Sequence, residues 1–335
     1  MKVYAVFADA RMALGQVPAY ARRVEALGYD GLLVPEAIHD GMMAAMLAAE
    51  HSERIEIITS VVLAFPRSPM TLAYAARDVH ELSGGRFSLG LGSQVRGNMV
   101  GRFSVQWHPP AARMRDYVGS LRAIWQSWQN GQQLSFESEH YRFSRMQPFF
   151  NPGPSEHGRI PVYLGAVGPK MAEVAGQVAD GLLTHPTNSD PRYVREVSVA
   201  AITKGRPRSF NLIASTFVAT GPDVEAVATE RERIRDYLGF LYSTPNYWPT
   251  LKLHGWEEVG RRLNEHAKKG RWEVMKAEIS DEMLDVLVPS ATYQDIASLL
   301  MKWYGGLAAG ITLPVPADPA DDEALASVVC QLKQG

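Results

Sequence analysis

A carboxylate and an imidazole, Glu36 and His39, follow a short apolar run, and together they could move a proton. An unperturbed imidazole changes charge near about pH 6.5, so it can give and accept protons at neutral pH, and a neighbouring carboxylate can orient it. The structural alternative is that His39 and Asp40 only cap a helix that begins near Gly41. From these residues alone, both interpretations stay open.

A glycine-containing turn, Gly165-Ala166-Val167-Gly168, is the second candidate site. It lies between a predicted strand and a predicted helix, so its backbone N–H groups and the helix N-terminus could hold an anion such as phosphate. Thr184 and His185 end the next predicted strand and could add a hydroxyl and an imidazole. Lys170 is a nearby cation, or a solvated residue of the first helical turn.

The stretch 83–93 predicts the end of a helix, a tight turn and a buried strand. Gly84 and Gly85 supply the positive φ that stops a helix and reverses the chain. The strand then ends in small residues, which leave room for a flat or bulky group to approach the backbone: Gly90, Gly92 and Ser93.

Strand-like and helix-like runs alternate along the chain, which predicts a parallel sheet. Eight such units favour an α/β fold of the closed (β/α)8 TIM-barrel type, with its chemistry at the C-terminal ends of the strands. The predicted strands are 3–7, 31–35, 55–63, 86–92, 161–165, 181–184, 211–219 and 310–315. The main predicted helices are 17–27, 41–51, 69–82, 110–128, 169–178, 191–204, 224–242, 293–304 and 321–332.

Two insertions interrupt this alternation, at about 131–160 after the fourth strand and about 243–282 after the seventh. No interdomain linker is visible, so the sequence predicts a single domain over residues 1–335. The aromatic residues of the second insertion could roof a substrate pocket, form a dimer contact or build the insertion's own core: Tyr242, Tyr247, Trp248, Trp256 and Trp272.

The composition argues against several classes of function. Lysine plus arginine total 34 and aspartate plus glutamate total 36, with no basic stripe, so we expect no nucleic acid partner. No run approaches the roughly 20 apolar residues of a membrane helix, and no signal peptide is visible, so the cytoplasm is the expected location. Asp9-Ala10-Arg11 follows the first strand where a metallohydrolase barrel would need His-x-His, so we expect no metal.

Two longer stretches resemble the bacterial luciferase-like superfamily, and within it the branch of coenzyme F420-dependent oxidoreductases. They are Thr59-Ser60-Val61-Val62-Leu63-Ala64-Phe65-Pro66-Arg67-Ser68-Pro69 and Leu82-Ser83-Gly84-Gly85-Arg86-Phe87-Ser88-Leu89-Gly90-Leu91-Gly92-Ser93. The resemblance continues at 161–169, 179–186, 243–247 and 254–256, and so covers nearly the whole chain. It implies a TIM-type barrel that binds the deazaflavin F420, or alternatively FMN, and transfers hydride.

The resemblance also implies roles for single residues. A non-proline cis peptide bond that supports the ring would fall at Ser60–Val61, and Asn98 matches a residue that bonds the ring. From the residues themselves, and not from the resemblance, we expect His39 to exchange a proton with the substrate as hydride moves, and Glu36 to bond the ring or orient a neighbour. The predicted cofactor-binding residues are Ser60, Val61, Gly92, Ser93, Asn98, Gly165, Ala166, Val167, Gly168, Thr184 and His185.

The chain departs from the family pattern at two positions. Val95 stands where the sugar-phosphate dehydrogenases of the superfamily carry a glutamate, which disfavours sugar-phosphate oxidation. Ala37 stands where some F420 enzymes carry a histidine base. The substrate is therefore a small organic molecule of open identity, and relatives that pair through barrel helices make a homodimer the expected assembly.

Three alternatives stay open beside the F420 oxidoreductase. The first is an FMN-dependent monooxygenase that uses O2. The second is a non-redox aldolase or isomerase, which would need a strand-borne lysine or paired carboxylates that the sequence does not offer. The third is a protein that holds F420 without turnover, which the changes at Val95 and Ala37 make worth testing.

Overall fold

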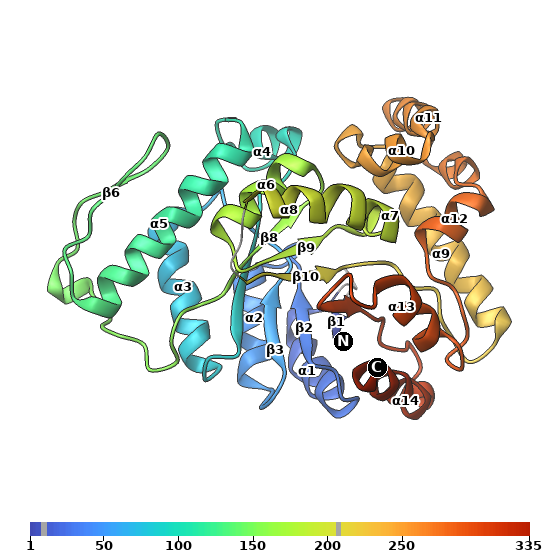
Figure 1. Ribbon diagram of the computed structural model, residues 1–335, viewed down its shortest axis with the longest axis horizontal. Coiled ribbons are helices and arrows are strands. Elements are labelled where there is room, and N and C mark those ends of the chain that lie inside the picture. Colours follow the sequence, from blue (N-terminus) through green and yellow to red (C-terminus); the bar gives the residue numbers. More distant parts are fainter. Residues whose placement is uncertain (8–11, 206–208) are drawn as a thin grey trace.

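Eight parallel strands close into a barrel in the computed structural model, which describes residues 1–7, 12–205 and 209–335 (Figure 1). The segment Asp9-Ala10-Arg11 lies outside the described residues. The strand order is β3-β2-β1-β11-β10-β9-β8-β5-β4, in which β3 and β4 are two parts of the third barrel strand. Pairing of β3 with β5 closes the ring. The predicted (β/α)8 TIM barrel is therefore confirmed.

The strand bounds follow the predicted runs closely. They are β1 (Lys2–Val6), β2 (Gly31–Val34), β3 (Glu56–Thr59), β4 (Val62–Leu63), β5 (Phe87–Gly92), β8 (Val162–Ala166), β9 (Gly181–Thr184), β10 (Asn211–Ala214) and β11 (Gly310–Thr312). The helices around them are α1 (Val17–Ala26), α2 (Gly41–Glu50), α3 (Pro69–Leu82), α5 (Pro110–Asn130), α6 (Pro169–Val178), α8 (Ala200–Gly205), α13 (Ile296–Tyr304) and α14 (Asp322–Gln334).

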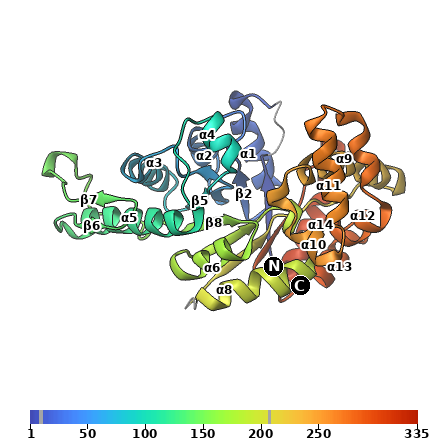
Figure 2. The same cartoon turned by 90° about the horizontal axis from the view of Figure 1, so that it is seen from above.

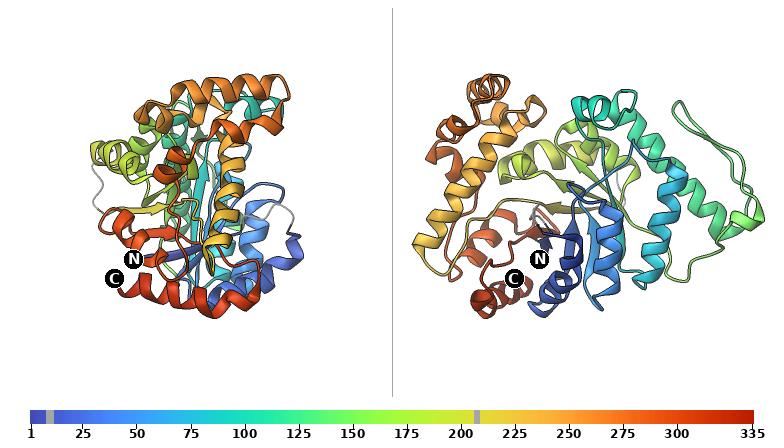
Figure 3. Two further views of the ribbon diagram at one scale, coloured as in Figure 1. Left: turned by 90° about the vertical axis from the view of Figure 1, so that its right-hand side faces the viewer. Right: turned by 180° about the vertical axis from the view of Figure 1, so that it is seen from behind.

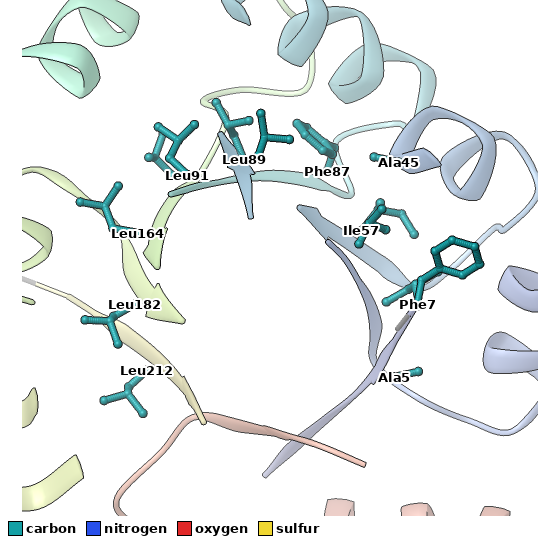
Figure 4. Close-up of a cluster of buried hydrophobic side chains, with 14 of the residues drawn as sticks. Ala5, Phe7, Ala45, Ile57, Phe87, Leu89, Leu91, Leu164, Leu182 and Leu212 are labelled. Atoms are coloured by element: carbon teal, nitrogen blue, oxygen red, sulfur yellow. The ribbon is translucent and has the colours of Figure 1, made fainter. Parts of the chain in front are cut away.

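Neighbouring residues on each strand serve two separate cores, because successive side chains of a strand point to opposite faces. Leu182 packs outward against the helices, with Leu89, Leu164 and Leu212 in the same layer (Figure 4). Leu183 instead joins the cluster that fills the barrel interior, whose buried members are Tyr4, Leu33, Ile58, Tyr163, Leu183 and Ile213. This packed interior leaves the ends of the strands as the place for a site.

The two insertions lie on opposite sides of the barrel (Figure 2). The first carries the short antiparallel hairpin of β6 (Phe136–Glu137) and β7 (Arg142–Phe143). The second contains α10 (Pro249–His254) and α11 (Glu257–Lys268), and these pack with α12 (Asp281–Leu287) beside α9 (Val224–Tyr242) (Figure 3). This second group has a buried apolar cluster of its own, which includes Leu238, Tyr242, Leu251 and Leu263.

Several predicted elements differ in the structure. The helix expected over 191–204 is interrupted by a π-helical segment, Val194–Val199, between α7 (Pro191–Tyr193) and α8. The strand expected over 211–219 ends at Ala214. Beyond it the Thr216 N–H donates to the hydroxyl of Thr312 in β11 at 2.9 Å, in place of a backbone partner, and Ala219 then pairs with Ser290 outside the barrel sheet. The short helix α4 (Arg96–Gly101) was not predicted, since its six residues hold too few apolar positions to show a helical period.

The strand expected over 55–63 is also interrupted, by one extra residue. Ile58 pairs with Ser88 and Val62 pairs with Leu91. These pairs are four residues apart on the third strand but three residues apart on β5, so the third strand contains one extra residue. Such a mismatch is a β-bulge. The peptide bond Ser60–Val61 within it is cis, as the family resemblance implies.

The hydroxyl of Thr59 closes the gap that the bulge opens. It accepts a hydrogen bond from Gly90 N at 2.8 Å and donates one to Gly90 O at 2.9 Å. A Cβ on Gly90 would lie only 1.8 Å from the backbone oxygen of Thr59. Glycine at position 90 is therefore a requirement of the third strand's path.

The described part of the chain contains no helix with the length and apolar character needed to cross a bilayer.

We predict that Gly90→Ala lowers the free energy of unfolding by at least about 3 kcal/mol, because the added methyl group overlaps fixed backbone. The measurement is the shift of the urea-unfolding midpoint. Gly97→Ala is the matched control, since a Cβ there meets nothing within 4 Å. It should change stability by no more than about 1 kcal/mol. Equal stability of the two variants would contradict this account of the bulge.

Candidate active site

The predicted site residues gather at one end of the barrel. They follow β2, occupy the bulge between β3 and β4, and end or follow β5, β8 and β9, so they share the C-terminal edge of the parallel sheet. Figure 1 shows α4, α6 and α10 around this end. The arrangement agrees with the usual place of a TIM-barrel active site.

Val61 forms an apolar wall at this end. Its methyl groups occupy the space beside two glycines: a Cβ on Gly92 would lie 2.3 Å from Val61 Cγ2, and one on Gly165 would lie 3.0 Å from Val61 Cγ1. Val61 and Val6 are half-buried and pack on the interior cluster. The glycines thus make room for the bulge, whereas the sequence suggested that they admit a ligand directly. A ligand contact of Gly92 stays a prediction.

Glu36 is held by two partners after the end of β2. Its two oxygens accept hydrogen bonds from Arg67 Nη1 at 2.9 Å and Nη2 at 2.8 Å. Glu36 Oε2 also accepts a bond from Leu63 N at 2.8 Å. The side chain is 12% exposed, so this carboxylate is positioned to orient its surroundings.

His39 and Asp40 have separate roles in the next turn. Asp40 caps α2 by accepting bonds from Met42 N at 2.9 Å and Met43 N at 3.4 Å, which confirms the capping interpretation for this residue. His39 Nε2 lies 3.1 Å from the Met12 carbonyl oxygen. Because a carbonyl only accepts, Nε2 carries the hydrogen there, and Nδ1 is the basic atom of the neutral ring.

The N-terminus of α6 is open. Gly168 occupies the N-cap position. Among the residues that the structure describes, no side chain caps the helix, and none lies within 4 Å of a Cβ built on Gly168. Pro169 has no N–H, so Lys170 and Met171 provide the first N–H groups of the helix without intrahelical partners. Tyr193 donates to the Val167 carbonyl at 2.7 Å and supports the turn. Ala166 ends β8 and is buried. The geometry suits an anion.

Thr184 and His185 are engaged within the protein. The buried Thr184 hydroxyl lies 2.6 Å from Ser189 Oγ and accepts a bond from Ser215 N at 2.9 Å. The His185 ring stacks on Tyr247, with centroids 4.4 Å apart. Burial lowers the pKa of His185 to about 4, so the ring is neutral at pH 7. Contacts of these two residues with a phosphate stay predictions.

The segment after β5 forms the part of the rim between the bulge and the end of β8. Ser93 is half-buried, and Asn98 is exposed on α4, where its Nδ2 donates to Gln94 Oε1 at 3.2 Å. Gln94 has a φ of 57°, an uncommon value for a residue with a Cβ. Arg102 reaches from the end of α4 to the Ala37 carbonyl at 3.2 Å, so the loops after β2 and β5 are in contact.

Sequence reasoning missed the polar groups that join the second insertion to the barrel. The buried Asp190 carboxylate accepts a bond from Tyr193 N at 3.0 Å and lies 3.1 Å from His254 Nε2. Tyr242 donates to the Thr187 carbonyl at 2.8 Å. The position of Asp190 before a proline-initiated helix was the available signal, because aspartate is a favoured N-cap.

The aromatic residues of the second insertion have several different environments. Tyr242 is buried in the insertion's own cluster, while Tyr247, Trp248 and Trp256 pack on that cluster. Trp272 is 49% exposed on the outer surface.

Within the described ranges, no group of three or more His, Cys, Asp or Glu side chains could hold a metal ion.

We predict a pH-dependent stability difference between the wild-type protein and His185→Gln. The lowered pKa of His185 means that, between pH 6.5 and about 4, the unfolded chain takes up a proton that the folded protein does not. The stabilisation from the neutral ring is thus complete above about pH 6.5 and declines as the pH falls. Between about pH 7.5 and about pH 5 the difference should shrink by about 2 kcal/mol in urea unfolding. A difference that does not change with pH would contradict the burial.

Comparisons with known proteins agree with the fold and the motifs. A family model described as luciferase-like monooxygenase matches residues 4–309. An uncharacterized protein of Mycobacterium tuberculosis is 41% identical over 283 residues, which cover 83% of each chain. A 5,10-methylenetetrahydromethanopterin reductase of Archaeoglobus fulgidus is 28% identical over 313 residues, covering 90% of this chain and 88% of that protein.

The fold is shared with a solved structure, that of the coenzyme F420 dependent tetrahydromethanopterin reductase from Methanopyrus kandleri. The TM-score is 0.78 at 17% identity, over 100% of this chain and 98% of that chain. The family model covers most of the chain, and the residues that carry the motif form one mouth of the barrel. The chain therefore belongs to the luciferase-like monooxygenase family and is an enzyme of that family.

Proposed function

We propose that this enzyme transfers hydride between coenzyme F420 and a small organic substrate at the C-terminal mouth of the barrel. One observation supports this most: the apolar wall of Val61 lies against Gly165, three residues before the open N-terminus of α6 at Gly168. A flat ring needs an apolar wall, and its phosphate-bearing tail needs an anion site. Both lie on adjacent parts of one rim.

In this proposal the chain's own residues provide binding and orientation. Val61 supports one face of the ring and excludes water from it, while Ser60, Ser93 and Asn98 offer polar groups around it. The N–H groups of Lys170 and Met171 bind the phosphate. When bound, F420 supplies the hydride chemistry, for which the protein itself has no group.

His39 is the proposed proton carrier. Its Nδ1 is the basic atom, since Nε2 is oriented by the Met12 carbonyl. Glu36 is proposed to orient this region, because both of its oxygens accept hydrogen bonds from Arg67. In this proposal the imidazole of His39 exchanges the proton, and the carboxylate of Glu36 orients the residues around it.

An FMN-dependent monooxygenase is the second candidate, favoured by the monooxygenase description of the family. FMN also has a flat ring and a phosphate, so the same wall and helix end would serve it.

We further propose that the enzyme works as a homodimer and in the cytoplasm. The exposed Met43 and Met46 on α2 support a contact between two copies.

Titration of the purified protein with F420 and with FMN tests the proposal. We expect F420 to bind with micromolar or tighter affinity, followed by quenching of its fluorescence, and FMN to bind more weakly. Tight binding of FMN with oxygen consumption by the reduced complex would favour the monooxygenase instead. Failure of both ligands to bind would contradict the proposed function.

The variant Gly168→Asp distinguishes an effect on F420 binding from an effect on the stability of the fold. Aspartate is a favoured N-cap, so the melting temperature should stay the same or rise. The new carboxylate would repel a phosphate at the same helix end, and the Kd for F420 should rise roughly tenfold or more. Gly97→Asp, which adds the same charge on α4, should have a smaller effect. Unchanged affinity in Gly168→Asp would exclude the α6 N-terminus as the phosphate site.

A further inference from the structure

We infer that Arg67 is a positioning residue of this site, which fixes the loop carrying His39 against the bulge carrying Val61. The inference rests on the proposed function, because it concerns the same mouth of the barrel. Arg67 lies four residues beyond Leu63 in the loop that follows β4, and sequence reasoning gave it no role.

One guanidinium group joins two carboxylates at the rim. Besides its paired bonds to both oxygens of Glu36, Arg67 Nη2 donates to Asp40 Oδ2 at 2.6 Å. Paired hydrogen bonds between a guanidinium and a carboxylate restrict both position and angle. The Arg67 and Glu36 side chains are 19% and 12% exposed, so solvent screens this pair less than a surface ion pair, whereas the pair with Asp40, which is 46% exposed, is screened more.

These two carboxylates lie on either side of His39 in the sequence. Glu36 comes three residues before it and Asp40 directly after it, so both ends of this short loop are attached to Arg67. Asp40 also caps α2 through Met42 N. The histidine therefore sits between two anchored points, and its ring is oriented by the contact of Nε2 with the Met12 carbonyl.

The same cluster connects to the bulge. Glu36 Oε2 accepts the Leu63 N–H, and Arg67 Nη1 also donates to the Leu63 carbonyl at 3.1 Å. Leu63 lies two residues beyond Val61. In addition, Tyr117 of α5 donates to the Arg67 carbonyl at 3.2 Å, so Arg67 is itself held by a barrel helix. Arg67 thus connects the proposed wall of the ring and the proposed proton carrier to a rigid element.

The electrostatics favour the charged forms of Asp40 and Arg67. Although burial acts to raise it, the ion pair with Arg67 holds the pKa of Asp40 below its usual value. Burial acts to lower the pKa of Arg67, but the two carboxylates raise it above its usual value. Without the guanidinium, the largely buried Glu36 and the exposed Asp40 would be two like charges without their shared partner, and the loop would move to separate them.

The test compares Arg67→Ala with a matched control at the other end of the barrel. Arg122 is the control, because it is 22% exposed and pairs with Asp180, which precedes β9. We would measure amide hydrogen exchange without cofactor. In Arg67→Ala the Leu63, Met42 and Met43 amides should exchange at least about tenfold faster than in the wild-type protein, and in Arg122→Ala they should exchange at the wild-type rate. Unchanged exchange at these amides would overturn the inference.

F420 titration then tests the consequence for the site. Arg67→Ala should raise the Kd for F420 about tenfold, and low-millimolar guanidinium should restore affinity where sodium at equal ionic strength does not. Arg67→Lys keeps the charge without the paired bonds and should be intermediate, which also covers the case that Arg67→Ala does not fold. Arg122→Ala should lower stability but leave the Kd unchanged.

The outcomes separate the two proposals. Wild-type protein that fails to bind F420 removes the proposed function. If the wild-type protein binds F420 and Arg67→Ala binds it with the same Kd, the inference about Arg67 is wrong and the proposed function stands. The same holds if Arg122→Ala loses as much affinity as Arg67→Ala.

Discussion

The close approach of the third strand to β5 is the constraint on which the site depends. At Gly90 the backbones come so near that a Cβ would lie 1.8 Å from the Thr59 carbonyl oxygen. This approach, together with the Thr59 hydroxyl, lets the third strand accommodate an extra residue without losing its place in the barrel. The extra residue moves Val61 across the strand ends, where Gly92 and Gly165 accept its methyl groups.

Charge and burial then fix the surroundings of this wall. On one side, Arg67 holds the loop after β2 through Glu36 and Asp40. On the other side, buried polar groups such as Asp190 and Thr184 fix the loop after β9 and attach the second insertion to it. At the N-terminus of α6, backbone donors are left open, and so this part of the rim offers an apolar wall beside an anion site.

The strands and barrel helices could be predicted from the sequence because each is a buried run with a clear period and a glycine or proline at its ends. The bulge could not be derived from such patterns, since Ile55 to Leu63 reads as one continuous strand rich in β-branched residues; only the family resemblance placed a cis bond at Ser60–Val61. The contacts of Arg67 with Glu36 and of Asp190 with His254 join residues 31 and 64 positions apart, and local patterns carry no information on such contacts. For the same reason Thr184, which seemed free to bind a ligand, is committed to Ser189 and Ser215.

A crystal structure of the enzyme with F420 bound tests the central claim most directly. The account predicts one face of the ring against Val61 and the phosphate within hydrogen-bonding distance of the Lys170 and Met171 N–H groups. A ring bound away from the bulge, or a phosphate held elsewhere on the barrel with the α6 N-terminus empty, would contradict it.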